Sequence, residues 1–229
     1  MRINADFARS AFSRPADQQW VASPQSGVER VMLDRVGAEN ARATSLVRYA
    51  PGSNFPHHQH IGGEEILVLS GTFSADGEDF PAGWYLRNPP GSSHAPSSTE
   101  GTVIFVKLQQ MRADEQCEVR VNSRDPSAWT SQGGRAVCLL FSNGVEEVCL
   151  LRLQDGQRVL PERVEGAEML VLSGEICIGD ASYPEGSWIR LPAGDFPAAA
   201  AAAGPAGAEL YLKCGRLGGP GAVVPEHAA

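Results

Sequence analysis

The chain has 229 residues, of which 20% are charged, and its formal net charge is −8. An acidic chain without a cluster of lysine and arginine is a poor candidate for binding nucleic acid or an anionic membrane surface, so we expect neither partner. No apolar run approaches the roughly 18 residues that a membrane helix needs, and the N-terminus lacks the hydrophobic segment of a signal peptide. We therefore expect a cytoplasmic protein.

Short strands separated by turns are expected throughout the chain. The segment 43–50 alternates between polar and apolar residues, 64–71 is largely apolar, and 76–83 supplies turn residues before the next strand. With 25 glycines, 16 prolines and little helical periodicity, the composition favours an all-β protein.

The sequence also repeats itself. Four blocks recur in the same order at an offset of about 100 residues: 19–33 with 128–140, 42–56 with 146–161, 64–73 with 167–176, and 83–91 with 186–194. A repeat this long indicates two copies of a domain rather than a solenoid. We predict two small antiparallel barrels or jelly rolls in tandem, with a first domain at 1–112 and a second at 113–229.

Four of the five histidines lie in the first copy, and three of them, with one glutamate, suggest a metal site there. His58 and His60 are two residues apart, so in an extended strand they point to the same side, whereas His57 points away. Gly62 and Gly63 allow a tight turn before Glu64, and a second hairpin can deliver His94. Three imidazoles and a carboxylate suit one divalent transition metal ion such as zinc, iron, manganese, nickel or copper.

The spacing of these residues resembles that of a known family. The first cupin motif is matched by Gly52, His58, His60, Glu64 and Gly71, and the second by Gly83, Pro89, Gly91 and His94. The trailing Asn of the second motif is replaced by Ser98. Within the cupins, the segments 20–28 and 62–71 are similar to the ChrR-type group. The resemblance implies an RmlC-like jelly roll in each half, a bicupin, with His58, His60, Glu64 and His94 as ligands.

The second copy has lost these ligands. Glu162, Arg163 and Val164 cover the positions of the paired histidines, and Pro197 stands where His94 would fall. Aligned on Gly174, Ala167 replaces Glu64 and Glu168 replaces Glu65; a shift of one residue would instead retain Glu168 as a lone carboxylate. We expect no transition-metal site in the second barrel. Glu65 itself should face away from Glu64, as a solvated group or a support for the site.

Two functions of different classes remain open, beside a third alternative of a binding or storage-like bicupin with a vestigial metal site. The ChrR-type resemblance implies a regulatory or sensory protein, similar to the cupin part of an anti-sigma factor, in which four protein ligands favour zinc. ChrR also carries an N-terminal sigma-binding zinc domain; because the first 40 residues here contain neither Cys nor His, we expect this chain to lack that domain. The group also includes dioxygenases that cleave diketones, which implies a metal-dependent enzyme with iron, manganese or nickel as further candidates.

An enzyme would need a substrate pocket, and several side chains near the motifs are candidates to line it. They are the aromatic residues Phe55, Phe73, Trp84, Tyr85 and Phe105, with Arg48 or Arg87 to hold an anionic substrate. No catalytic residue can be assigned from the sequence, and the small-molecule ligand, any protein partner and a homodimeric state all stay open.

Overall fold

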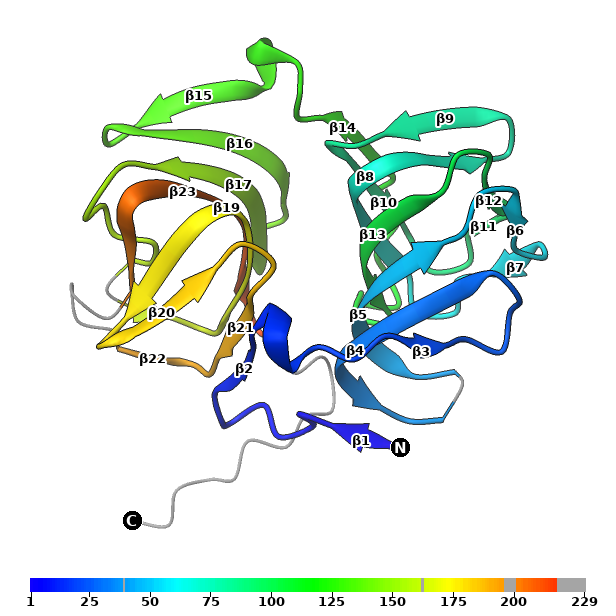
Figure 1. The fold of residues 1–229 in the computed structure, drawn as a ribbon, viewed down its shortest axis with the longest axis horizontal. Coiled ribbons are helices and arrows are strands. Elements are labelled where there is room, and N and C mark those ends of the chain that lie inside the picture. The colour runs from blue at the N-terminus through cyan, green and yellow to red at the C-terminus, as the bar shows by residue number, and fades with distance from the viewer. Residues whose placement is uncertain (39, 162, 196–200, 218–229) are drawn as a thin grey trace.

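The computed structural model describes residues 1–38, 40–161, 163–195 and 201–217. Within these ranges the regular secondary structure is β-strand apart from two single-turn 3-10 helices, η1 (Pro15–Asp17) and η2 (Pro126–Ala128). The strands form two barrels that lie side by side (Figure 1). The predicted all-β fold of two tandem jelly-roll barrels is confirmed. In the described part of the chain, no helix is long and apolar enough to cross a membrane.

The first barrel is built on an 11-stranded antiparallel sheet whose main order is β1-β4-β5-β13-β8-β10-β14, with a separate two-stranded sheet of β7 and β11. Its strands are β1 (Arg2–Ile3), β3 (Val21–Ala22), β4 (Val28–Val36), β5 (Arg42–Tyr49), β6 (Ser53–Asn54), β7 (His58–Gln59), β8 (Glu64–Ala75), β9 (Glu78–Pro81), β10 (Trp84–Asn88), β11 (Ser93–His94), β12 (Pro96–Ser98), β13 (Thr102–Leu108) and β14 (Val119–Asn122).

The second barrel is built on an 8-stranded sheet whose main order is β15-β16-β17-β23-β19-β21-β2, with β18 and β22 as a separate pair. Its strands are β2 (Ala11–Ser13), β15 (Trp129–Gln132), β16 (Arg135–Ser142), β17 (Glu146–Leu153), β18 (Arg163–Val164), β19 (Ala167–Ile178), β20 (Ala181–Pro184), β21 (Trp188–Leu191), β22 (Gly194–Asp195) and β23 (Ala202–Gly215).

The repeated sequence blocks occupy equivalent strands. The order β4-β5-β13-β8-β10 in the first sheet matches β16-β17-β23-β19-β21 in the second. Glu65 pairs with Arg87 between β8 and β10, and Glu168 pairs with Arg190 between β19 and β21. The register therefore makes Glu168 the counterpart of Glu65.

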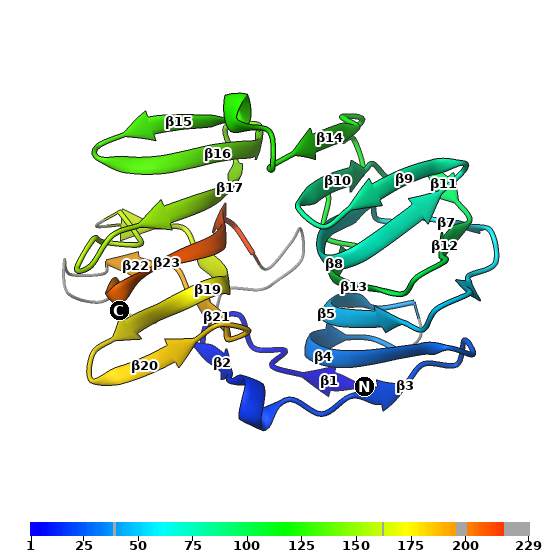
Figure 2. The same ribbon diagram turned by 45° about the horizontal axis from the view of Figure 1, so that its top comes forward.

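Two strands cross the predicted boundary at 112/113. β2, near the N-terminus, pairs with β21 of the second sheet, and β14, which follows the boundary, pairs with β10 of the first. Figure 2 shows the N-terminal segment passing beneath both barrels, while the link from β14 to β15 bridges them on the opposite side. Each barrel is thus completed by a strand from the other side of the boundary.

Alternation along β8 separates the two faces of the first barrel. Ile66 packs inside it in a cluster with Phe73, Leu86 and Ile104. Leu67 faces the second barrel, in a cluster that spans the interface. Because successive side chains of a strand point to opposite faces, Glu64 shares the inner face with Ile66 and Glu65 shares the interface with Leu67.

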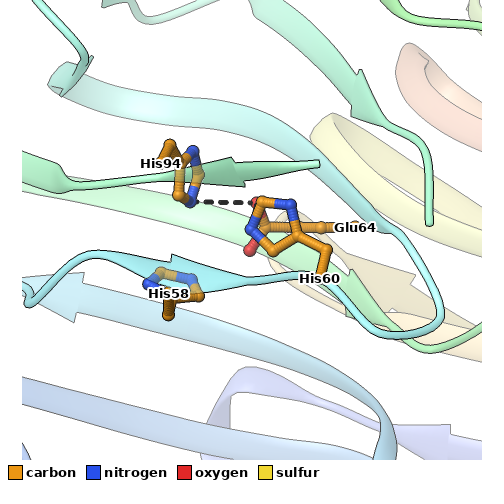
Figure 3. Close-up of side chains that lie close together, drawn as sticks. All are labelled: His58, His60, Glu64 and His94. Carbon is orange, nitrogen blue, oxygen red and sulfur yellow. Dashed lines mark ion pairs between the residues drawn. The ribbon is translucent and has the colours of Figure 1, made fainter. Parts of the chain in front are cut away.

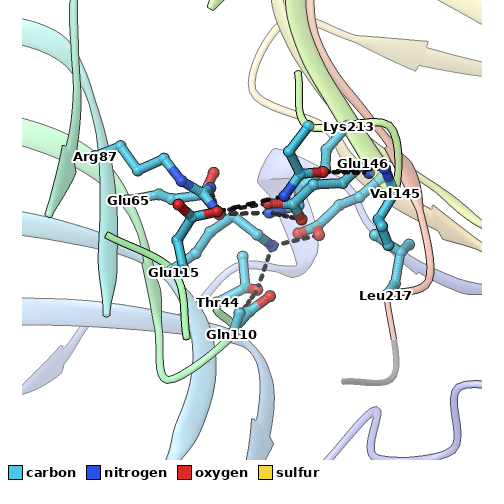
Figure 4. Close-up of polar contacts among 12 residues, drawn as sticks. Thr44, Glu65, Arg87, Gln110, Glu115, Val145, Glu146, Lys213 and Leu217 are labelled. Atoms are coloured by element: carbon cyan, nitrogen blue, oxygen red, sulfur yellow. Dashed lines mark hydrogen bonds and ion pairs between the residues drawn. The ribbon is translucent and has the colours of Figure 1, made fainter. Parts of the chain in front are cut away.

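Glu65 lies in a buried network of charges between the barrels (Figure 4). It is 2% exposed, forms ion pairs with Lys213 and with Arg87 at 3.0 Å, and accepts a hydrogen bond from Tyr85 Oη at 2.9 Å. Burial alone would raise the pKa of Glu65, but Lys213 and Arg87 outweigh burial and lower it to about 2. The expectation that Glu65 is a solvated group is therefore wrong, because a second barrel covers the outer face of β8.

Candidate metal centre

The structure brings the four predicted ligands together inside the first barrel (Figure 3). His58 lies on β7, His60 just after it, Glu64 at the start of β8, and His94 on β11. One ligand atom from each of the four lies within 4.8 Å of the other three. His60, Glu64 and His94 are each 5% exposed, whereas His58 is half-buried.

Two local pairings create this convergence. His94 lies opposite His58 in the β7–β11 pair, and His60 exchanges backbone hydrogen bonds with the neighbouring turn, through its N–H to Ser92 O and its carbonyl oxygen to Gly91 N–H, both at 2.8 Å. Gly63 then reverses the chain with a φ of +76°, and a Cβ there would lie 2.4 Å from Met111 Sδ. Glycine is required at this turn, since it tolerates positive φ and leaves room for Met111.

Hydrogen bonds behind the histidines determine which ring nitrogen faces the centre. Ser92 Oγ donates to Pro89 O at 2.6 Å, so it must accept its 2.9 Å bond from the Nδ1–H of His60. His58 Nδ1 likewise donates to Pro56 O at 3.0 Å. In the neutral form of each ring the proton is therefore on Nδ1, and Nε2 carries the lone pair that a metal ligand requires.

Glu64 is oriented in a similar way. Asn88 Nδ2 donates to Glu64 Oε2 at 3.0 Å, and both side chains are buried. Burial raises the pKa of the Glu64 carboxyl to about 7, although Asn88 favours the ionised form. A divalent cation beside this carboxylate would offset the cost of burying its charge.

The two buried imidazoles are held in their neutral form. Burial, followed by the nearby His58, lowers the pKa of His60 to about 4. Burial and the neighbouring His60 lower the pKa of His94 to about 3. At neutral pH both rings therefore present lone pairs rather than protons, which is the state that binds metal.

The donor set fits a metal ion. His60 Nε2 and His94 Nε2 are buried without a hydrogen-bond partner among the described residues. They lie 3.3 Å and 3.4 Å from Glu64 Oε2. Buried nitrogen atoms are seldom left unsatisfied, and their convergence on one carboxylate oxygen gives the mixed N/O environment that zinc, iron, manganese and nickel accept.

The candidate pocket aromatics divide between two places. Phe55 packs edge-on against His58 with ring centroids 5.2 Å apart, and Phe73 lies 5.9 Å from His94, so both flank the centre. Trp84 packs against Phe80 in the barrel core. Tyr85 and Phe105 lie instead in the cluster between the barrels.

Neither arginine proposed as an anion anchor is available to the centre. Arg48 is exposed, pairs with Glu29 and stacks over Trp20. Arg87 is 1% exposed and committed to the interface, where it pairs with Glu65 and, at 2.6 Å, with Glu146. The idea that one of them points into the site is wrong, because both side chains lie on the outer face of their strands.

One residue that the sequence analysis did not single out is Arg120, on β14. Its positive charge lowers the pKa of His60, Glu64 and His94. This strand belongs to the linker after the first sequence copy, yet it pairs with β10 and places Arg120 opposite the core residue Leu86. The alternation of VRVN at 119–122, with valines at every second position, is the one signal that could have indicated a strand with Arg120 on its other face.

The second barrel contains no comparable cluster among the residues that the structure describes. Ala167 pairs with Leu191 where Glu64 pairs with Asn88, so Ala167 is the counterpart of Glu64. Arg163 is exposed and Val164 is buried in the apolar core. Glu162 and Pro197, the other two positions compared with ligands, lie outside the described residues.

Residues 8–112 match the family described as the ChrR Cupin-like domain. Both barrels have the cupin fold. Within the first barrel, His58 and His94 lie on the paired strands β7 and β11, while His60 follows β7 and Glu64 begins β8. No curated protein sequence matches the chain.

Several solved cupin structures superpose on nearly the whole chain. A candidate dioxygenase from Nostoc punctiforme covers 100% of this chain and 87% of its own, with 14% identity and a TM-score of 0.66. The bacterial pirin YhhW of Escherichia coli, solved with nickel(II), covers 90% of this chain and 99% of its own, with 14% identity and a TM-score of 0.65. Oxalate decarboxylase of Bacillus subtilis, described for its Mn(II) centres, covers 90% and 77%, with 11% identity and a TM-score of 0.60.

Proposed function

We propose that the protein binds one divalent transition metal ion through His58, His60, Glu64 and His94, and that it acts as a regulatory or sensory cupin. The carrying observation is the pair of unpartnered, buried Nε2 atoms directed at Glu64 Oε2. Four protein ligands in a mostly buried site are typical of a tightly held metal, with zinc favoured and iron, manganese or nickel as alternatives.

The regulatory role is supported by the family match over 8–112 and by the position of the centre. His58 is the half-buried ligand, so a small molecule would approach the metal from its side of the site. A change at the metal could then be transmitted through β8, since this strand carries Glu64 on one face and the interface residue Glu65 on the other. A protein partner would read that change.

A metal-dependent dioxygenase that acts on a small diketone or related ketone is the second candidate. It is supported by the flanking rings of Phe55 and Phe73 and by the Nostoc punctiforme structure, which is described as a candidate dioxygenase. In either role the bound metal would supply Lewis acidity. The chain itself would hold the imidazoles neutral, fix their orientation through Ser92 and Pro56, and exclude water from the inner side of the site.

One experiment tests the proposal and separates the two roles. The protein is purified anaerobically, its metal content is measured, and oxygen uptake is followed with a panel of small diketones. Stoichiometric zinc without oxygen uptake supports the regulatory role. Stoichiometric iron with diketone-dependent uptake supports the dioxygenase. Absence of any bound transition metal, together with failure to take up added zinc, iron, manganese or nickel, contradicts both.

A further inference from the structure

The geometry points to Arg120 as the residue that recruits a small organic anion, a carboxylate or an enolate, to the centre formed by His58, His60, Glu64 and His94. This inference rests on the proposed metal site and names the class of ligand that it takes. It applies to a sensor, whose signal would be the anion, and to an enzyme, whose substrate would be the anion.

The strand register places Arg120 on the inner face of the first barrel. Arg120 lies opposite Leu86 in the β10–β14 pair, and paired residues of neighbouring strands share a face. Leu86 is fully buried in the core cluster of that barrel, together with Phe80. Val119 and Val121, on the other face of β14, pack in the cluster between the barrels.

Arg120 is held at the edge of the barrel interior while its charge stays accessible. Its Nη1 donates to Arg87 O at 3.2 Å and to Val119 O at 2.8 Å, and the guanidinium lies 5.6 Å from the centroid of the Phe80 ring. Its side chain is 29% exposed. Glu118, its ion-pair partner at 2.7 Å, is 63% exposed, so solvent weakens the competition from Glu118 for the guanidinium.

The electrostatics of the centre agree with this placement. Burial is the largest cause of the shifted pKa values of His60, Glu64 and His94, and the positive charge of Arg120 lowers the pKa of all three. The register agrees, because Arg120 lies opposite Leu86, two residues from Asn88, whose side chain donates to Glu64 Oε2. With neutral imidazoles, a divalent ion exceeds the single negative charge of Glu64, and Arg120 adds to the excess.

This excess of positive charge selects the ligand. In a chain of net charge −8, the metal-loaded centre beside Arg120 would carry an excess of positive charge that attracts an anion and disfavours a cation. Arg120 Nη1 is engaged by Arg87 O and Val119 O, so Nη2, which pairs with the exposed Glu118, is the nitrogen that would meet an oxygen atom of a carboxylate or an enolate. The rings of Phe55 and Phe73 beside His58 and His94 add apolar surface for the organic part of the ligand.

The test uses the full chain loaded with Co²⁺, whose visible absorption spectrum reports a change in coordination. Metal content is measured first; a wild-type protein that takes up no Co²⁺ overturns the metal site itself. Benzoate, as the anionic probe, and imidazole, as a neutral comparator, are then titrated at low ionic strength. We expect Arg120→Gln to keep its Co²⁺, to bind imidazole as the wild type does, and to bind benzoate about tenfold more weakly, as the loss of a unit charge near the metal predicts.

Two further variants define the result. Arg120→Lys keeps the charge and should recover most of the benzoate affinity, and Arg112→Gln, an exposed linker arginine paired with Asp114, should change nothing. Glu118→Gln removes the competing carboxylate and should tighten benzoate binding, which provides the test if Arg120→Gln does not fold. Unchanged benzoate affinity in Arg120→Gln, or equal losses for benzoate and imidazole, overturns the inference while the metal site stands. In the Glu118 variant, unchanged or weaker benzoate binding also overturns it.

Discussion

Lys213 of the second barrel forms its ion pair with Glu65 of the first, and Lys107 of the first barrel forms the equivalent pair with Glu168 of the second. Each lysine is also the strand neighbour of the glutamate in its own barrel, so the pairs exchange partners across the interface. All four side chains are at most 3% exposed. The two barrels are therefore joined by two buried ion pairs. If the barrels separated, each of the four charged side chains would lose its partner in the other barrel.

Removing one member of such a pair should destabilise the whole chain. In Lys107→Met, Glu168 stays buried and loses its hydrogen bond from Lys107. It keeps the hydrogen bond from Trp188 Nε1, at 2.7 Å. We expect a loss of about 3–5 kcal/mol in the free energy of unfolding, measured by urea denaturation.

Two companion variants test this explanation. The double variant Lys107→Met with Glu168→Gln removes both charges and keeps an acceptor for Trp188, so it should recover most of the loss. Glu209→Gln, at the exposed pair with Arg152, should cost about 1 kcal/mol or less. Equal losses in Lys107→Met and Glu209→Gln would contradict a special role for the interface network.

Residues 117–229 should not form a stable barrel when expressed alone. This fragment lacks β2, which pairs with β21, and it leaves Glu168 and Lys213 without Lys107 and Glu65. We expect a spectrum with poor dispersion in two-dimensional NMR and no cooperative thermal transition. A well-dispersed spectrum would show that the strand and charge contacts across the boundary are dispensable.

Loss of either motif should abolish tight metal binding. His58→Ala and His94→Ala each remove a ligand from a different strand, so we expect each to lower the affinity for zinc by at least about a hundredfold, more than the loss of an outer partner costs. His57→Ala, whose side chain is exposed, is the matched control and should bind like the wild type. Competition with a chromophoric chelator measures all three; undiminished binding in both ligand variants would remove the site assignment.

Ser92→Ala should weaken metal binding without removing a ligand. Ser92 Oγ accepts from His60 Nδ1–H and thereby keeps His60 Nε2 unprotonated and aimed at the centre. We expect an affinity for zinc about 10-fold to 100-fold lower, with the fold intact by circular dichroism. Ser92→Thr retains the hydroxyl and should behave like the wild type, and a defect of equal size in both variants would argue against the tautomer explanation.

Metal affinity should rise with pH up to about neutrality. The pKa of Glu64 is raised to about 7, so below that pH the carboxyl is protonated and metal binding must release about one proton. His60 and His94, with pKa values of about 4 and 3, stay neutral and add nothing to this slope above pH 5. Calorimetry in buffers of different ionisation enthalpy measures the released proton, and Glu64→Gln should abolish it.

The same shift predicts the stability of the metal-free protein. A carboxyl whose folded-state pKa lies above its ordinary value stabilises the fold below the ordinary pKa, and that contribution is lost as pH rises through the folded pKa. The stability of the metal-free chain, relative to Glu64→Gln, should therefore fall as pH rises from about 5 to 7 and stay lower above pH 7. Metal-free chains whose stability difference does not change over this range would contradict the burial of an ionisable Glu64.

Motif spacing was enough to predict the metal-ligand set as a hypothesis, and the structure places those four residues together. The reason is local: His58 and His60 share a face by alternation, Gly63 turns the chain at once to Glu64, and only one further hairpin has to deliver His94. The roles of Glu65, Arg87 and Arg120 were missed or misjudged, because each depends on a neighbour that no local pattern specifies.

The sequence by itself determined the two tandem barrels, the repeated strand blocks of each copy and the candidate ligands, since strand alternation and glycine turns act over a few residues. Tertiary structure alone decided that β2 and β14 cross between the barrels, that Glu65 and Arg87 are buried at the interface, and that Arg120 faces the interior. These outcomes depend on contacts between residues far apart in the chain. The outer face of a strand is exposed to solvent unless another barrel packs against it and makes that face an interface.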